Sequence, residues 1–144
     1  MSLFLGIDFG TSGVRTSVIN PNKEEIINFS VSIEKPIVKD SLVYQDPSLW
    51  WNSLIKNLQF LSTKIDLSKI ERLSIDGTSG TVLICDDQGS PIDHALMYND
   101  ASSVEEAKLV EKISSGHPIV SSPTNALVRA LSLIKKNSAQ SYRI

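Results

Sequence analysis

Apolar and polar positions alternate over the first 34 residues in the manner typical of β-sheet. The alternating runs extend from Leu3 to Asp8, from Val14 to Asn20 and from Glu24 to Glu34, and Pro21-Asn22-Lys23 has the composition of a turn. The pattern therefore predicts a three-stranded antiparallel meander that begins with a hairpin from Leu3 to Asn20.

A helix is expected next. The stretch 35–45 has little periodicity and ends at Asp46-Pro47, an N-cap residue followed by proline at the first helical position. Apolar residues then follow the three-and-four spacing of one buried helix face: Trp50, Trp51, Leu54, Leu58, Leu61 and Ile65. This spacing assigns the tryptophan pair to the core.

The rest of the chain alternates between strands and helices. We expect a buried strand at Arg72–Asp76, further strands at Thr81–Cys85 and Ala95–Tyr98, and a tight turn at Asp86-Asp87-Gln88-Gly89. Ser102-Ser103-Val104-Glu105 has the form of a capping box, so a helix should run to about Ser114 and stop at Gly116. A last helix is expected from about Thr124 to Lys136, with Leu127, Leu131 and Ile134 on one face.

This order of elements predicts an α/β fold with a mixed sheet whose first three strands are antiparallel and which is flanked by helices. The 144 residues are 41% hydrophobic and 21% charged, the composition of an ordinary globular protein. The formal net charge of −2 does not indicate binding to nucleic acid or to an anionic membrane surface. No export leader and no run of about 18 apolar residues is present, so we expect a cytoplasmic protein. Cys85 lies in an apolar run, which favours a buried structural thiol.

The first candidate for chemistry is Asp8, because a carboxylate at the end of an apolar strand needs a cation or hydrogen-bond donors nearby. A Mg²⁺ ion meets that need. The turn Gly10-Thr11-Ser12-Gly13 then offers two glycines that let backbone amides approach an anion, and Arg15 offers a fork of donors for phosphate. The alternative is a simple hairpin turn in which these residues serve backbone geometry alone.

Further segments make the nucleotide-phosphate interpretation more specific. Leu5-Gly6-Ile7-Asp8-Phe9-Gly10-Thr11-Ser12-Gly13-Val14-Arg15 resembles the opening of the FGGY carbohydrate kinases, in particular their xylulokinase and ribulose kinase branch. Gln45-Asp46-Pro47-Ser48-Leu49-Trp50-Trp51, the stretch 73–81 and Tyr98-Asn99-Asp100 resemble later segments of the same family. The resemblance extends from Leu3 to about Tyr142. The opening segment alone indicates only the superfamily, whereas the combination of segments indicates the family.

The resemblance implies an actin-like, ribonuclease H-like fold that closes on ATP and a sugar. By this resemblance Asp8 stands near Mg²⁺, Thr11 and Ser12 line the phosphate turn, and Arg15 helps to neutralise the γ-phosphate. Asp76, Thr78 and Ser79 then occupy the sugar-pocket turn, and Asn99 and Asp100 lie at the cleft wall. Two alternatives stay open: Asp76 as a strand-end carboxylate held by backbone amides, and Asn99-Asp100 as a cap for the helix at Ser102.

Two departures from the family bear on the substrate. Many xylulokinases carry Gln-Met-His in the sugar turn and an arginine two residues after the Asn-Asp aspartate, where this chain has Gly77-Thr78-Ser79-Gly80 and Ser102. D-ribulose or a related pentulose is therefore favoured over D-xylulose. Neither His94 nor His117 fills the gap, and both are expected at the surface.

The family's catalytic base is an aspartate far downstream, so the resemblance places the base beyond Ile144 and no catalytic residue is expected within residues 1–144. These residues correspond to the N-terminal part of the family's first domain. The expected function of the complete protein is ATP-dependent phosphorylation of a pentulose, with a small-molecule sugar as partner and a homodimer left open. The alternatives are a non-catalytic sugar- or partner-binding remnant of such a kinase and, less favoured, an actin-like ATPase lobe.

Overall fold

The computed structural model describes residues 2–115 and 117–137, which form two compact units. The described residues of unit 1 are 2–35 and 48–78, and those of unit 2 are 36–47, 79–115 and 117–137. No helix among these residues has the length and apolar character needed to cross a membrane.

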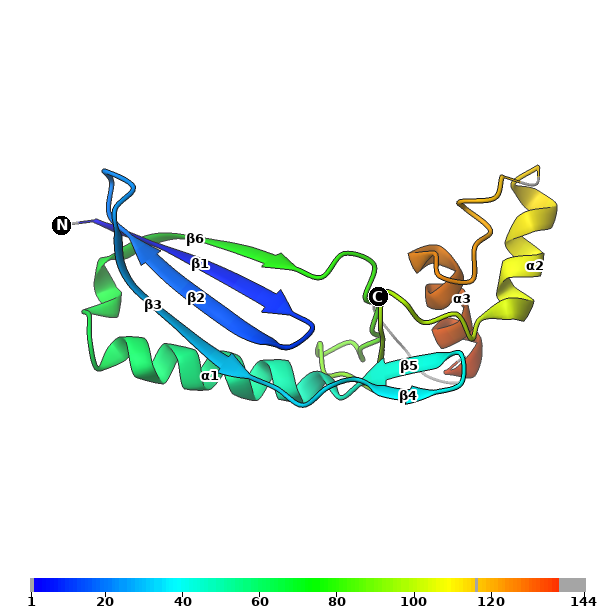
Figure 1. Cartoon of the computed structure of the whole chain (residues 1–144), viewed down its shortest axis with the longest axis horizontal. Coiled ribbons are helices and arrows are strands. Elements are labelled where there is room, and N and C mark those ends of the chain that lie inside the picture. Colours follow the sequence, from blue (N-terminus) through cyan, green and yellow to red (C-terminus); the bar gives the residue numbers. More distant parts are fainter. Residues whose placement is uncertain (1, 116, 138–144) are drawn as a thin grey trace. The chain divides into compact units, whose positions relative to one another are not determined.

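Unit 1 contains a four-stranded sheet with the strand order β3-β2-β1-β6 (Figure 1). Its strands are β1 (Leu3–Gly10), β2 (Gly13–Ile19), β3 (Glu25–Ser32) and β6 (Ile70–Gly77). The first three are antiparallel neighbours, and β6 lies parallel to β1. The predicted meander and the mixed character of the sheet are therefore confirmed.

One face of this sheet packs against α1 (Pro47–Ser62), which ends shortly before a 3₁₀ turn at Leu67–Lys69 (Figure 1). The buried side chains of this core are Leu3, Leu5, Ile7, Val14, Val18 and Leu61. Asn57 on α1 adds a buried polar link, since it accepts a hydrogen bond from the Thr16 hydroxyl at 3.0 Å and donates to the Val14 carbonyl at 3.2 Å. These bonds fix the register of the helix on β2.

The helix starts where the sequence predicts, but its buried face differs from the predicted one. Trp50 is half-buried and packs against the core, whereas Trp51 is 63% exposed. The assignment of both tryptophans to the core is thus wrong for Trp51, because the buried face follows Ser53, Asn57 and Leu61 at four-residue intervals.

Strand β6 is present as predicted, but it is not buried. It pairs with β1 along one edge only, and Leu73 and Ile75 are 61% and 62% exposed. Apolar and polar residues alternate at the end of this strand, with Leu73 and Ile75 between Arg72, Ser74 and Asp76. Among the described residues β6 stands at the edge of the sheet.

Unit 2 contains a small sheet with the order β4-β5-β7, formed by Ile37–Lys39, Leu42–Gln45 and Ala95–Leu96. The first two strands form a hairpin within the stretch 35–45, which has little periodicity, and Asp40 adopts a positive φ of 54° in its turn. Strands this short leave almost no alternation to detect, so sequence alone missed them.

The predicted strand at Thr81–Cys85 is absent. Only two isolated bridges are formed there, Val82 with Leu96 and Cys85 with Pro91. The strand predicted to reach Tyr98 stops at Leu96, because the chain then turns and the Asp100 N–H donates to the Met97 carbonyl at 2.9 Å.

The turn at 86–89 is confirmed, with the Gly89 N–H donating to the Asp86 carbonyl at 3.1 Å. The neighbouring Cys85 is half-buried, where burial and then the charge of Asp86 raise the pKa of its thiol. A raised pKa disfavours the reactive thiolate.

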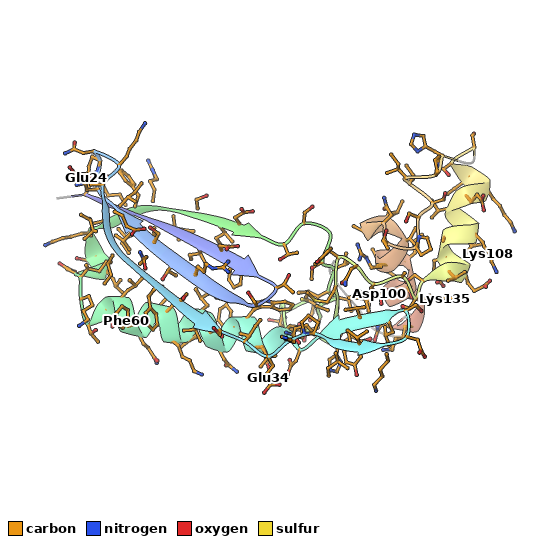
Figure 2. The ribbon with its side chains drawn as sticks, viewed as in Figure 1. Glu24, Glu34, Phe60, Asp100, Lys108 and Lys135 are labelled. Atoms are coloured by element: carbon orange, nitrogen blue, oxygen red, sulfur yellow. The ribbon has the colours of Figure 1, made fainter. Side chains whose placement is uncertain are left out.

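Two helices complete unit 2: α2 (Val104–Ile113) and α3 (Ala126–Lys136). They pack through Ala107, Val110 and Val128, and Lys135 of α3 donates to Glu106 of α2 at 3.0 Å. Figure 2 labels Lys135 on its helix. On α3 the buried side chains are Val128, Arg129 and Leu133, while Leu127 is 50% exposed, so the predicted apolar face is rotated.

The predicted capping box is wrong. Ser103 is the N-cap of α2 and makes no side-chain cap bond, and the hydroxyl of Ser102, the first residue of the predicted box, donates to Asp100 at 2.9 Å. The helix ends at Ile113, close to the expected end, and the proposed stop at Gly116 lies outside the described residues.

Candidate functional site

The β1–β2 turn is held by its carbonyl oxygens. The Phe9 carbonyl accepts the Thr78 N–H at 3.1 Å, and the Ser12 carbonyl accepts the Ile33 N–H at 3.0 Å. The Gly10 carbonyl accepts the indole N–H of Trp50 at 2.9 Å. The three donors come from α1 and from the residues that follow β3 and β6. None of these three bonds uses the N–H of Thr11 or Ser12.

Close packing requires a glycine at position 13 and leaves little space for a side chain at Gly10. A Cβ on Gly13 would lie 2.6 Å from the Val31 carbonyl oxygen of β3, a distance that no side chain tolerates. A Cβ on Gly10 would lie 3.2 Å from Nη1 of Arg15. The glycines therefore let the turn lie directly against β3 and the guanidinium, in addition to any approach of an anion.

Asp8 and Arg15 are register partners on β1 and β2. Nη1 of Arg15 donates to Oδ2 of Asp8 at 2.8 Å, and the side chains of Arg15 and Asp8 remain 58% and 43% exposed. Arg15 therefore supplies within the chain the cationic partner that Asp8 needs, and both side chains remain partly exposed.

Asp76 is the register partner of Asp8 on the other side, in the parallel strand β6. Register partners in neighbouring strands point to the same face, and the strands lie about 4.8 Å apart, so two carboxylates stand side by side. The Gly77 N–H donates to Oδ1 of Asp76 at 2.8 Å. A backbone amide therefore holds this carboxylate at the strand end, as the alternative interpretation of Asp76 predicts.

Thr78 follows the end of β6, at the start of the predicted sugar turn, and its hydroxyl lies near the β1–β2 turn. Its hydroxyl lies 3.4 Å from the Thr11 hydroxyl and 3.4 Å from the Phe9 carbonyl oxygen. The two segments that the sequence assigned to different ligands, the phosphate turn and the start of the sugar turn, therefore touch within unit 1.

A hollow of about 470 Å³ lies over the same face of the sheet. Its polar lining includes Asp8, Arg15, Ser17, Asn28, Ser30, Ser74 and Asp76. Glu25 at its rim accepts hydrogen bonds from Ser17 at 2.9 Å and Asn28 at 2.6 Å. The hollow thus brings together acidic, basic and amide side chains from β1, β2, β3 and β6.

The donor set fits a magnesium–nucleotide better than a metal held by protein alone. Within residues 2–115 and 117–137, no group of three or more His, Cys, Asp or Glu side chains is placed to hold a metal ion. Mg²⁺ is usually bound through one or two carboxylates together with substrate phosphates, and the partly exposed Asp8 is one such carboxylate.

The remaining predicted sugar contacts, Ser79, Asn99 and Asp100, belong to unit 2. Ser79 and Asn99 are exposed, whereas Asp100, labelled in Figure 2, is completely buried. Its carboxylate accepts the Val43 N–H at 2.7 Å and the Ser102 hydroxyl. Asp100 therefore ties β5 to the segment before α2, and the expectation that it lines a cleft wall is not met by its side chain.

Sequence reasoning missed one contact of the phosphate turn. The spacing of apolar residues predicts a core position for Trp50, yet its indole N–H also donates to the Gly10 carbonyl. The signal was available, since a buried indole N–H nearly always finds an acceptor. His94 and His117 are exposed, as predicted.

The last segment of the chain bears on the expected catalytic base. Ile144, beyond which the sequence places that base, and Tyr142, where the family resemblance ends, both lie outside the described residues. The position of the base therefore stays a prediction, and the described geometry concerns the phosphate turn and the sugar turn.

Comparison with known proteins gives one consistent answer. The model for "FGGY family of carbohydrate kinases, N-terminal domain" matches residues 3–135. A xylulose kinase from Staphylococcus xylosus is 24% identical over 135 residues, which is 94% of this chain and 28% of that protein. A xylulose kinase from Escherichia coli K12 is 27% identical over 113 residues, covering 76% of this chain and 22% of that protein.

Among solved structures, a ligand-bound xylulose kinase from Lactobacillus acidophilus superposes with a TM-score of 0.80 at 16% identity. The match covers 98% of this chain and 30% of that one. The expected α/β actin-like fold is thereby confirmed, and the chain spans less than a third of the length of these relatives.

Proposed function

This chain belongs to the FGGY family of carbohydrate kinases, and we propose that it supplies the phosphate-binding and acceptor-binding part of an ATP-dependent kinase for a pentulose sugar. The substrate class follows the names of the xylulose kinases to which the chain is similar.

The proposal rests on one observation, the side-by-side register of β1 and β6. Asp8 and Asp76 are partners, and Thr11 and Thr78 touch through their hydroxyls. Phosphoryl transfer depends on holding the acceptor hydroxyl against the terminal phosphate in line with the leaving oxygen. A phosphate turn that touches the first residues of a sugar turn is suited to this requirement.

Each residue of the turn has a distinct task in this proposal. The N–H groups of Thr11 and Ser12 bind phosphate oxygens, and Arg15 places its positive charge beside them while it orients Asp8. Asp8 would hold Mg²⁺, with Asp76 as its acidic neighbour. When bound, that ion neutralises the negative charge of the phosphates. Thr78 and Ser79 orient the sugar, and Asp76 accepts a hydrogen bond from a sugar hydroxyl.

The preferred sugar in this proposal is D-ribulose or a related pentulose. The turn Gly77-Thr78-Ser79-Gly80 and Ser102 replace groups that many xylulokinases carry. We further propose that the general base lies beyond Ile144, since this chain corresponds to less than a third of its relatives' length.

A coupled ADP-release assay on the full-length protein tests the proposal, with D-ribulose, D-xylulose, L-ribulose and glycerol as acceptors. We expect turnover with a pentulose and the highest kcat/KM with D-ribulose. Sugar binding without ADP release for all four acceptors would instead support a non-catalytic sugar-binding protein. Turnover by residues 1–144 alone would refute the assignment of the base to a later segment.

A further inference from the structure

A buried guanidinium lies in unit 2, on the second turn of α3. Arg129 is only 1% exposed, and its Nε has no hydrogen-bond partner among the described residues. Burial lowers the pKa of Arg129, while the charge of Asp100 raises it. Burying an arginine in this way is costly, so a role that only a long, multiply donating side chain can fill is expected.

The guanidinium binds two carbonyl oxygens from different segments. Nη1 donates to the Met97 carbonyl, and Nη2 donates to the Thr124 carbonyl at 2.6 Å. The Met97 carbonyl also accepts the Asp100 N–H at 2.9 Å. Arg129 therefore fastens the turn from Met97 to Asp100, which presents Tyr98 and Asn99 at the surface.

The same guanidinium lies against the second half of the predicted sugar turn. Gly80 has a φ of +80°, and a Cβ there would stand 3.2 Å from Nη2 of Arg129 and 3.8 Å from Cβ of Tyr98. A glycine at this position lets the backbone pass directly over the guanidinium. One side chain thus contacts both the turn at 79–80 and the turn at 97–100.

We propose that Arg129 is a positioning residue for the acceptor sugar, which holds Ser79-Gly80 and Tyr98-Asn99 in one fixed arrangement without touching the sugar. The inference rests on the proposed function and extends it to a residue on a distant helix. The turns that Arg129 contacts belong to unit 2, whereas the phosphate turn belongs to unit 1. Loss of the Arg129 contacts should therefore weaken acceptor binding without changing nucleotide binding.

The test compares substitutions at two adjacent positions of α3 in the full-length protein. Arg129→Met is expected to raise KM for the sugar about tenfold or more, because small displacements of positioning groups are costly. KM for ATP should change by less than about twofold, because substitutions at distant sites act nearly independently. Arg129→Lys retains a donor for the Met97 carbonyl and should restore part of the sugar affinity.

Val128→Ala is the matched control, because Val128 is buried in the α2–α3 contact. It should lower Tm without changing KM for the sugar. If Val128→Ala raises that KM as much as Arg129→Met at an equal loss of Tm, the effect is general destabilisation and the inference is refuted.

Gly80→Ala provides a second route if Arg129→Met does not fold, since the added methyl group presses on Nη2. It should also raise KM for the sugar selectively. An unchanged KM in Gly80→Ala and in Arg129→Lys would then refute the inference while the proposed function stands. Absence of sugar-dependent turnover in the full-length protein would refute both the proposed function and the inference about Arg129.

Discussion

Asp8 and Asp76 are register partners on neighbouring parallel strands, so two carboxylates stand side by side at the mouth of the phosphate turn. Among the described residues, Asp8 is paired with the Arg15 guanidinium, whereas Asp76 forms no ion pair. Parallel pairing of β1 with β6 brings these two residues, far apart in the sequence, next to each other.

Asp8→Asn removes the charge that we propose holds Mg²⁺ while keeping the size of the side chain. We expect kcat of the full-length protein to fall by about 100-fold or more, the usual loss when a main electrostatic group is removed. Since Asp8 is 43% exposed, Tm should change little. A coupled ADP-release assay and a thermal unfolding curve measure the two effects. An unchanged kcat would exclude Asp8 from the site.

Asp76→Asn should act on the acceptor. We expect KM for the pentulose to rise about tenfold, consistent with the loss of one hydrogen bond to a charged group, while the Mg²⁺ concentration for half-maximal rate is unchanged. Titrations of sugar and of Mg²⁺ under otherwise identical conditions separate these quantities. A shift in the Mg²⁺ requirement with an unchanged KM for the sugar would make Asp76 a metal ligand instead.

Trp50→Phe removes the bond to the Gly10 carbonyl but keeps an aromatic ring in the core. The free energy of unfolding should fall by about 1 kcal/mol, the typical net value of one hydrogen bond. Urea denaturation measures the change. Trp51→Phe is the matched control and should stay within about 0.5 kcal/mol of the parent, because Trp51 is 63% exposed. Equal effects of the two substitutions would contradict the assigned role of Trp50.

Gly13→Ala should destabilise unit 1 by about 1–3 kcal/mol, the cost of overpacking, because its Cβ would lie 2.6 Å from a carbonyl oxygen of β3. Gly6→Ala on β1 serves as the control, since its nearest neighbour would be 3.8 Å away. Denaturant midpoints of the two variants give the comparison. If Gly13→Ala is as stable as Gly6→Ala, the close approach of β3 does not restrict this position.

Asp93 should make unit 2 sensitive to acid. Burial raises the pKa of Asp93, but hydrogen bonds from Lys136, the His94 N–H and Asn137 lower it overall. Its folded-state pKa therefore lies below the unfolded value of 3.8, so its stabilisation is present above that value and is lost as the pH falls through the folded-state pKa.

The contribution of Asp93 is about 1 kcal/mol or less, since Lys136 is largely exposed. The decrease in unfolding free energy from pH 7 to pH 3 should be smaller in Asp93→Asn than in the parent. Lys136→Met, which removes the main partner, should flatten the profile in the same direction. Parallel pH profiles for all three proteins would contradict the assignment.

The sequence alone determined the local features of this chain. Alternation specified the meander, Asp46-Pro47 specified the start of α1, and the segment from Asp8 to Arg15 indicated phosphate chemistry. These features depend on neighbours in sequence, where periodicity and turn residues act directly on the backbone.

Only the tertiary structure decided which side chains meet. It paired Asp8 with Asp76, buried Asp100 against Val43, and placed Arg129 beneath Gly80. It also exposed Trp51 and formed strands at 37–45, where the sequence showed no pattern. Strand register, burial and the partner of a buried charge depend on residues distant in the chain, and local propensities carry no information about them.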